Sequence, residues 1–130
     1  MVEDLDQTEA NKTLVKDFVE TIFIRGQAER LDAYFEGDHY LQHNPMIANG
    51  VTGRKQGLTE MQKAGITVTF DRIHRVLGEG NFVLTLSEGT FDGKPTAFFD
   101  LFRVEHGKIA EHWDVLQAVP ATMPHDNGMF

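Results

Sequence analysis

The second half of the sequence alternates apolar and polar residues with a period of two, and this pattern constrains the fold most strongly. From Ile66 onward four segments carry it: ITVTFDRIHRVL, NFVLTLSEGTF, PTAFFDLFRVE and KIAEHWDVLQ. Short turn sequences separate them at residues 78–81 (GEGN), 92–93 (DG) and 106–107 (HG). Strands joined by such tight turns pair as antiparallel neighbours. The sequence therefore predicts a four-stranded antiparallel meander.

The first half has the spacing of amphipathic helices. A first helix is predicted to begin near Asp6, which has the spacing of a capping box with Glu9, and to end at Gly26. Its apolar stripe recurs every three or four residues and is expected to face the core. The residues of this stripe are Leu14, Val15, Phe18, Ile22 and Phe23.

Two further helices are predicted before the strands. One covers residues 28–35 and buries Leu31, Tyr34 and Phe35; the other begins near residue 52 or 53 and ends at residue 64, presenting Leu58 and Met61. Helices followed by an antiparallel meander predict an α+β domain. Helices packed on one face of a curved sheet would leave a concave hollow beneath them.

Composition limits the possible functions. With 130 residues, one domain over residues 1–130 is expected. The absence of cysteine excludes disulfides and thiolate chemistry. No run of about 18 apolar residues occurs and the acidic N-terminus does not resemble a secretory signal, so a cytoplasmic location is expected. A net charge of −8 disfavours nucleic acids and anionic membranes as partners.

The last predicted strand contains three titratable residues, Glu111, His112 and Asp114, beside the only tryptophan. Alternate residues share a face, so His112 and Asp114 point together, opposite Trp113 and Val115. Either His112 and Asp114 face solvent, or they face the hollow while Trp113 and Val115 cover a dimer partner. Spacing alone favours solvent, because an exposed polar face is common in antiparallel sheets. Glu111 is expected to form a salt bridge at the rim.

The preceding predicted strand places Asp100 on one face with Phe98 and Phe102. A charged carboxylate in such surroundings is costly unless it is paired or hydrogen-bonded. Burial would raise its pKa, as is common in acid/base sites. A structural role, in a hydrogen bond to a backbone amide or in an ion pair with Arg103 or Arg72, is equally open.

The short turn at residues 106–107 sets the pairing of these two strands. Counting outward from a two-residue loop places Arg103 opposite Ala110 and Asp100 near Trp113 and Asp114. Two carboxylates and a histidine could therefore share one patch of the sheet.

A polar extended segment, residues 39–45 (HYLQHNP), supplies further candidates. Tyr40, Gln42 and Asn44 would share one face, with His43 opposite. Its two histidines have the spacing of a helical metal pair, but proline opposes a helix and further ligands are missing, so no metal site is expected. The motifs of serine hydrolases, P-loop proteins and dinucleotide-binding proteins are absent.

Four stretches, together with the order of helices and strands, resemble a known family. They are YLQHNP, NGVTGRKQGL, FFDLFRVEHGKIAEHWDVLQ and NGMF, of which YLQHNP and EHWDVLQ are the most specific. Over nearly the whole chain the sequence resembles the SnoaL-like branch of the NTF2-like superfamily, in particular predicted SnoaL-like aldol-condensation enzymes of bacteria. The resemblance implies a cone-shaped α+β barrel that encloses one pocket, and a homodimer packed through the sheets.

The polyketide cyclases of this family close a ring by an intramolecular aldol reaction without metal or cofactor. The resemblance implies that Asp114 matches their general base on the last strand and that Asn44 matches their pocket asparagine. The resemblance also implies that His112 faces the pocket and that Trp113 lies on the outer face. Where those cyclases carry a pocket histidine, this sequence has Asp100, and a second carboxylate raises the pKa of the first.

The expected function is that of a cofactor-independent enzyme acting on a small, largely apolar carbonyl compound. Asp114 would remove a proton next to the carbonyl, and His112 and Asp100 would tune it or donate a proton. The candidates for holding the enolate oxygen are Asn44, Gln42 and His43, and those for other ligand contacts are Tyr40, Phe98, Phe102 and Trp113.

Two other functions are open. Water addition to an epoxide, performed by some relatives with this fold, needs two acids bridged by an arginine in the pocket, and Arg72, Arg75 or Arg103 could serve. A non-catalytic small-molecule-binding or dimerisation module is the third possibility, because one fold supports many functions.

Overall fold

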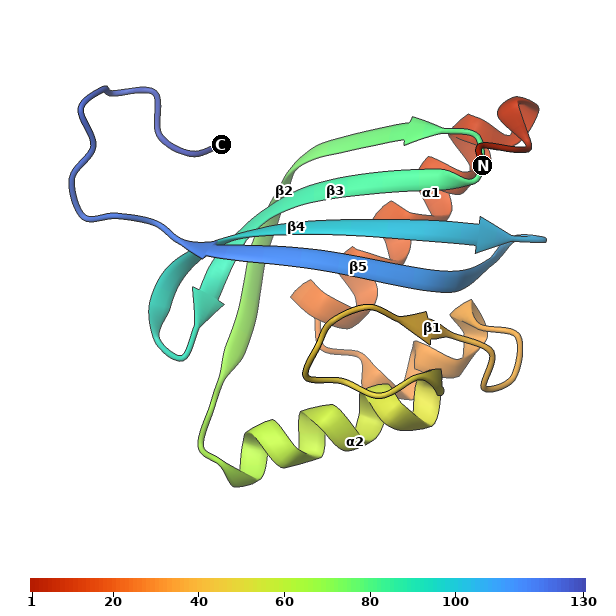
Figure 1. Ribbon diagram of the computed structural model, residues 1–130, viewed down its shortest axis with the longest axis horizontal. Helices are drawn as coiled ribbons and strands as arrows, with labels where there is room; N and C mark the ends of the chain where they lie inside the picture. The colour runs from red at the N-terminus through yellow and green to blue at the C-terminus, as the bar shows by residue number, and fades with distance from the viewer.

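The computed structural model describes all of residues 1–130 and shows helices covering one face of a curved sheet (Figure 1). The predicted α+β class is confirmed. None of the helices combines the length and the apolar character needed to cross a membrane. In chain order the elements are the 3-10 helix η1 (Leu5–Gln7), α1 (Thr8–Phe18), the π-helical η2 (Val19–Ile24), the 3-10 helix η3 (Ala28–Tyr34), β1 (Leu41–Gln42), α2 (Gly50–Lys63), β2 (Val68–Glu79), β3 (Phe82–Phe91), β4 (Lys94–Glu105) and β5 (Lys108–Ala118).

The sheet has five strands in the order β1-β5-β4-β3-β2. Its four long strands form the predicted antiparallel meander. The additional strand, β1, is only two residues long and runs parallel to β5, with Gln42 beside His112. This parallel pairing was not predicted. It holds the segment HYLQHNP against the strand that carries His112 and Asp114.

The first helix follows the predicted apolar stripe but not the predicted start. Val15 and Phe18 are fully buried, and the helical segment continues through η2 to Gly26, where φ is +64°. The capping box is wrong: Asp6 lies inside η1, and no side chain caps either η1 or α1. The first helical turn therefore begins at Leu5, before Asp6. The second predicted helix forms as the 3-10 helix η3.

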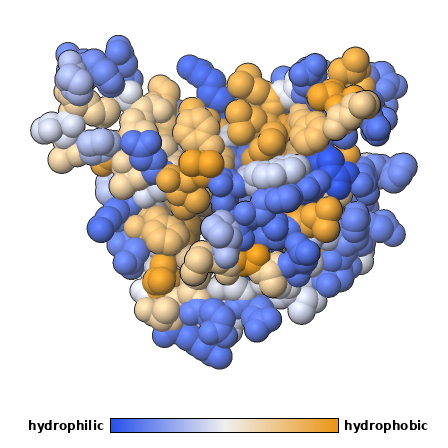
Figure 2. Space-filling model, in the orientation of Figure 1, coloured by the Kyte–Doolittle hydropathy of each residue, from blue (hydrophilic) through white to orange (hydrophobic).

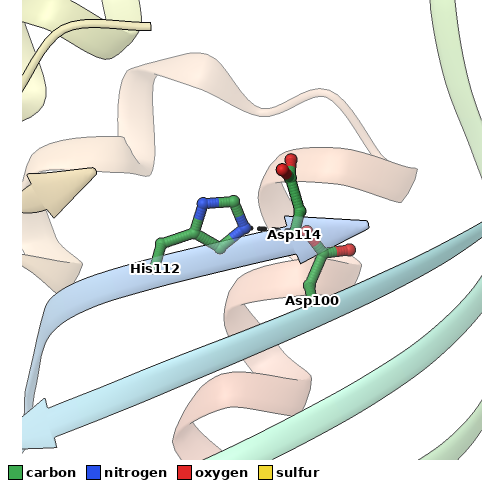
Figure 3. Close-up of side chains that lie close together, drawn as sticks. All are labelled: Asp100, His112 and Asp114. Carbon is green, nitrogen blue, oxygen red and sulfur yellow. Dashed lines mark hydrogen bonds and ion pairs between the residues drawn. The ribbon is translucent and has the colours of Figure 1, made fainter. Parts of the chain in front are cut away.

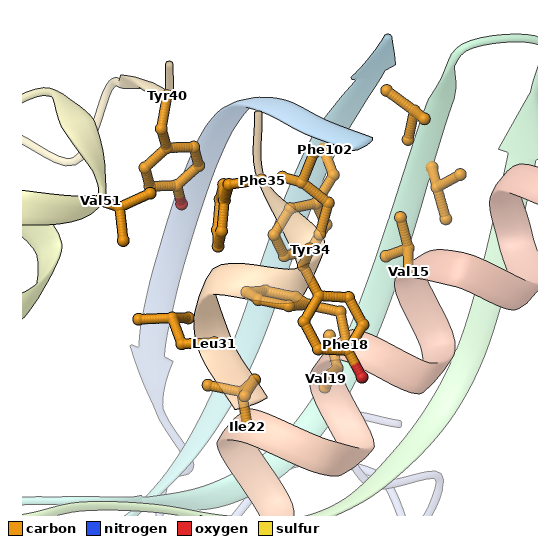
Figure 4. Close-up of a cluster of buried hydrophobic side chains, with 13 residues drawn as sticks. Val15, Phe18, Val19, Ile22, Leu31, Tyr34, Phe35, Tyr40, Val51 and Phe102 are labelled. Carbon is orange, nitrogen blue, oxygen red and sulfur yellow. The ribbon is translucent and has the colours of Figure 1, made fainter. Parts of the chain in front are cut away.

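The hydrophobic core lies between α1, η2, η3 and the inner face of the sheet (Figure 4). Phe18 is at its centre and contacts Tyr34, Phe35 and Phe102 edge to face, with ring centroids 5.1, 5.7 and 5.7 Å away. Edge-to-face contacts add about 0.5–1.5 kcal/mol each beyond burial of area. This cluster fixes the helices on the sheet.

The start of α2 is set by a contact with a distant aspartate. Asp38 Oδ1 accepts hydrogen bonds from the backbone N–H and the hydroxyl of Thr52, at 2.8 and 2.9 Å. These bonds lower the pKa of Asp38. Gly50 has φ +85°, and a Cβ there would lie 2.5 Å from Asp38 Oδ2. The helix therefore begins slightly earlier than predicted, and its first turn is held firmly in place.

Candidate functional site

A cavity of about 220 Å³ lies between α2 and the inner face of the sheet. Ten of its 16 lining residues are hydrophobic. These ten come from η2, α2, the four long strands and the loop before α2. An apolar pocket with a few convergent polar groups is the usual form of a ligand site. The polar side chains that line it are Gln42, Asn44, Arg54, Asp100, His112 and Asp114.

Strands β4 and β5 turn Asp100, His112 and Asp114 toward this cavity (Figure 3). Asp100 and Asp114 are direct partners across the two strands. Asp100 and His112 are only 3% and 5% exposed, and Asp114 is half-buried. The solvent-facing arrangement that spacing alone favoured is therefore wrong, because β1, α2 and the preceding loop cover this part of the sheet.

A β-bulge produces this pairing. The register shifts between Arg103 and Val104, so that Arg103 lies opposite Glu111 and not, as predicted, opposite Ala110. Ala110 is the extra residue, and it is buried. Counted without the bulge, Asp100 would lie opposite Trp113, and Asp114 would point to the other face of the sheet. The bulge therefore aligns the two carboxylates.

A chain of hydrogen bonds links Asp100, His112 and Gln42. His112 Nε2 lies 2.8 Å from Asp100 Oδ1, and His112 Nδ1 lies 2.9 Å from Gln42 Oε1. Gln42 Oε1 also accepts the backbone N–H of Asn44 at 2.9 Å, which identifies this atom as the amide oxygen. Because an amide oxygen only accepts, His112 Nδ1 must carry a proton. One further proton is shared between His112 Nε2 and Asp100 Oδ1, and the pair is neutral overall wherever that proton resides.

The surroundings of Asp100 raise the pKa of its carboxyl group. Burial raises its pKa, the hydrogen bond with His112 opposes this, and the charge of Asp114 adds to the increase. Its second oxygen, Oδ2, is buried without a hydrogen-bond partner. The Asp100–His112 pair therefore shares one proton in a buried position next to Asp114.

Asp114 is held by an amide. Asn44 Nδ2 donates to both oxygens of Asp114, each at 3.0 Å, and Asn44 Oδ1 accepts the backbone N–H of Met46 at 2.9 Å. Asn44 thus orients the carboxylate and is itself held by the loop. Asp114 is more exposed than Asp100, so it is the carboxylate that a ligand in the cavity would meet.

The three titratable residues also lie close enough to bind a common ion. Ligand atoms of Asp100, His112 and Asp114 are all within 4.8 Å of one another. Zinc accepts one imidazole and two carboxylates; here Asp100 Oδ1 and His112 Nε2 bond to each other, and both oxygens of Asp114 accept hydrogen bonds from Asn44.

Several predicted contact residues lie outside the cavity. His43 stacks on Trp113, with centroids 4.6 Å apart, and its Nε2 lies 2.6 Å from Glu111 Oε2. His43 and Trp113 therefore do not line the cavity, because pairing of β1 with β5 turns both to the outer face. Tyr40 and Phe102 are buried beside His112 and support its ring without lining the cavity. Phe98 does line it.

The arginines proposed to bridge two pocket acids also lie elsewhere. Arg103 pairs with Glu105 and, at 2.6 Å, with Glu111 on the outer face. The expected salt bridge of Glu111 is thus confirmed, although it lies across the sheet from the cavity. Arg72, which pairs with Glu88, and Arg75 are exposed and do not line the cavity.

Sequence reasoning missed Arg54, the one basic side chain in the cavity. It lies on α2 in the i, i+4, i+7 series with Leu58 and Met61, which also line the cavity. Its guanidinium carbon is 5.2 Å from the centroid of the Phe23 ring. The signal was present, because the sequence analysis assigns Leu58 and Met61 to one face of this helix, and Arg54 shares their spacing.

The fold and the cavity together define a class: small α+β domains in which helices and a curved sheet enclose a pocket lined with acid/base groups. The sequence profile of the family described as SnoaL-like domain matches residues 15–112. Since this is most of the chain, the protein belongs to the SnoaL-like domain family. A comparison with curated proteins found no match.

Solved structures show the same fold. A candidate ketosteroid isomerase from Kribbella flavida is 20% identical with a TM-score of 0.64, over 92% of this chain and 86% of that one. A candidate polyketide cyclase from Acidithiobacillus ferrooxidans is 16% identical with a TM-score of 0.63, over 82% and 87%. An LEH-like epoxide hydrolase from M. tuberculosis is 22% identical with a TM-score of 0.59, over 85% of each chain. Proteins described as NTF2-like also match. At these identities the similarity shows the NTF2-like fold alone.

Proposed function

We propose that the protein is a cofactor-independent acid/base enzyme that removes a proton next to the carbonyl of a small, largely apolar compound. The observation that carries this proposal is the placement of Asp114, Asp100 and His112 within 4.8 Å of one another in a mostly apolar cavity. The reaction would be an aldol-type cyclisation or an isomerisation. The family and its structural neighbours support this class of chemistry.

Asp114 is the general base in this proposal. Its carboxylate is half-buried at the cavity wall and oriented by Asn44. A positioned base contributes about a hundred- to ten-thousand-fold to the rate. The apolar lining strengthens the electrostatic interactions of the charged transition state.

The Asp100–His112 pair supplies the proton for the second half of the reaction. An aldol step converts the attacked carbonyl into an alkoxide, which must gain a proton, and an isomerisation must return one to carbon. The proton shared between Asp100 Oδ1 and His112 Nε2 lies close to Asp114, since ligand atoms of the three residues are within 4.8 Å of one another. Gln42 positions His112, and Asn44 is occupied with Asp114, so neither is assigned to the enolate oxygen.

The proposal is tested by following deuterium uptake at carbon next to the carbonyl, by ¹H NMR in D₂O, with a panel of small ketones and oxo acids. Asp114→Asn should abolish enzyme-dependent uptake while leaving the fold intact. Asp71→Asn, the same change at an exposed strand position without side-chain partners, should leave it unchanged. Full uptake with Asp114→Asn would contradict the assignment of the base.

Epoxide hydrolysis is a second candidate because two carboxylates line one cavity and an LEH-like epoxide hydrolase shares the fold. Arg72, Arg75 and Arg103 cannot bridge these acids, since all three lie outside the cavity. Arg54 is the one arginine that lines the cavity. Incorporation of ¹⁸O from labelled water into a diol product would favour this reaction over proton removal.

A non-catalytic binding module is the third candidate. It is favoured by the hydrogen bonds that already join Asp100 to His112 and Asp114 to Asn44. Ligands that bind in the cavity but show no enzyme-dependent deuterium uptake across the panel would support it.

We further propose a homodimer formed through the outer face of the sheet. Figure 2 shows hydrophobic side chains gathered on the face of the sheet that is turned to the viewer. Val115 and Phe99 are neighbours across β5 and β4 and are 68% and 36% exposed. Light scattering should therefore report a dimer for the wild type and a monomer for Val115→Lys. A monomeric wild type at micromolar concentration would contradict the proposal.

A further inference from the structure

Arg54 is the one arginine that is neither paired nor exposed. Arg25, Arg72 and Arg103 form ion pairs with glutamates, and Arg30 is exposed, as is Arg75. Arg54 is half-buried at the cavity wall and takes part in no ion pair and no side-chain hydrogen bond. Its burial lowers the pKa of the guanidinium, but arginine remains charged in proteins. Arg54 is therefore a cation in the cavity wall without an ion-pair partner.

Two contacts fix the position of Arg54. The contact of Asp38 with Thr52 fixes the first turn of α2, and the Phe23 ring lies under the guanidinium. A ring that covers one face of a guanidinium contributes a cation–π attraction. It leaves the N–H groups along the edge free, and this edge matches the two oxygens of a carboxylate.

The charges in the cavity favour one orientation of an anionic ligand. The Asp100–His112 pair is neutral overall, Asp114 is a carboxylate, and Arg54 is the only cation on the helical wall. A ligand carboxylate is attracted to Arg54 and repelled by Asp114. The opposite end of the same ligand is therefore directed to Asp114.

We propose that the ligand is a small oxo acid whose carboxylate binds Arg54 and whose carbonyl end faces Asp114. The choice of a carbonyl compound rests on the function proposed above; the binding of a carboxylate rests on Arg54 alone. A cavity of about 220 Å³ has the volume of roughly seven water molecules. A carboxylate on a short apolar chain fits this volume and the mostly hydrophobic lining.

The probes are 2-, 4- and 5-oxohexanoate, their methyl esters and 2-hexanone. The three acids vary the separation between carboxylate and carbonyl, and each ester removes the charge with little change of shape. Binding is measured by titration with NMR chemical shifts, and deuterium uptake is followed in the same samples. The variants are Arg54→Gln, Arg54→Lys, Asp114→Asn and, as a charge-matched control on an exposed part of the same helix, Lys63→Gln.

The wild type should bind at least one acid roughly ten- to a hundredfold more tightly than its ester, because hydrogen bonds between charged groups are the strong ones. Arg54→Gln should remove this preference, Arg54→Lys should retain part of it, and Lys63→Gln all of it. Asp114→Asn should keep the preference while losing deuterium uptake. If uptake is absent in the wild type but the Arg54-dependent preference remains, the enzyme proposal fails and the carboxylate site stands.

Equal affinity of the wild type for every acid and its ester would overturn the inference without any variant. A preference that survives Arg54→Gln would overturn it as well. If Arg54→Gln slows uptake by 2-hexanone as much as by the acids and leaves their binding unchanged, Arg54 stabilises the enolate, and the carboxylate assignment is wrong.

Discussion

Gln42→Leu is the substitution that most directly probes the hydrogen-bond chain beneath the cavity. Gln42 Oε1 accepts one bond from His112 Nδ1–H and one from the Asn44 backbone N–H. Leucine offers no acceptor. Asn44 is half-buried, so its N–H can turn to water, but His112 is 5% exposed and its Nδ1–H would be left buried without a partner.

Leaving one buried donor unpaired costs about 1–3 kcal/mol. We therefore expect Gln42→Leu to lower the free energy of unfolding by about 2 kcal/mol, and Tm by roughly 8 °C for a chain of this size. Urea unfolding followed by tryptophan fluorescence suits the measurement, because Trp113 is the only tryptophan and lies on β5 next to His112.

Two control variants separate this effect from a general effect of leucine. Gln42→Glu restores an acceptor and should recover most of the lost stability. Gln62→Leu makes the same change at an exposed position of α2 and should alter the unfolding free energy by less than about 0.5 kcal/mol. A loss below about 0.5 kcal/mol for Gln42→Leu would refute the assignment of a proton to His112 Nδ1.

Three further outcomes are expected. Burial raises the pKa of Asp100, so above about pH 4 the native state keeps a proton that the unfolded chain loses, and the stability of the wild type falls as pH rises. In urea titrations the stability of Asp100→Asn relative to wild type should therefore increase from about pH 4 upward. A difference that does not change with pH would contradict this. Gly50→Ala should lower the free energy of unfolding by about 1–3 kcal/mol, and by more than Gly65→Ala does. Both glycines have positive φ, but of the two only Gly50 would place a Cβ against a neighbour, the Asp38 carboxylate. Equal losses for the two variants would show that this contact is unimportant. Treatment with EDTA should leave deuterium uptake unchanged, and a loss that zinc restores would instead assign Asp100, His112 and Asp114 to a metal.

The overall fold was largely predictable because its signals are local. Alternation along the four long strands, with glycine-containing turns between them, predicted the meander. The apolar stripe through Phe18 predicted the first helix. The 3-10 form of η3 was not predictable, because an apolar pattern over seven residues does not distinguish between helix types.

The pairing of elements far apart in the chain was less predictable. The bulge at Ala110 decides which residue lies opposite Asp100, and counting from the turn cannot detect it. The contact of β1 with β5 depends on the tertiary fold, and it is what turns His43 outward and Gln42 toward His112.

The site was therefore predictable in part. Asp100, His112 and Asp114 were named from the sequence because titratable residues among aromatic ones are unusual. Arg54 was missed, although it lies at helical spacing from Leu58 and Met61, which the sequence analysis had assigned to one face of this helix.

The central claim, that a base in a fixed position removes the proton, is tested most directly by the stereochemistry of deuterium uptake. The methylene carbon next to the carbonyl of 2-hexanone or an oxohexanoate carries two hydrogens that a base held on one side distinguishes. The account predicts that the wild type labels one of the two positions and that Asp114→Asn labels neither. Equal labelling of both positions, or selective labelling that survives Asp114→Asn, would contradict it.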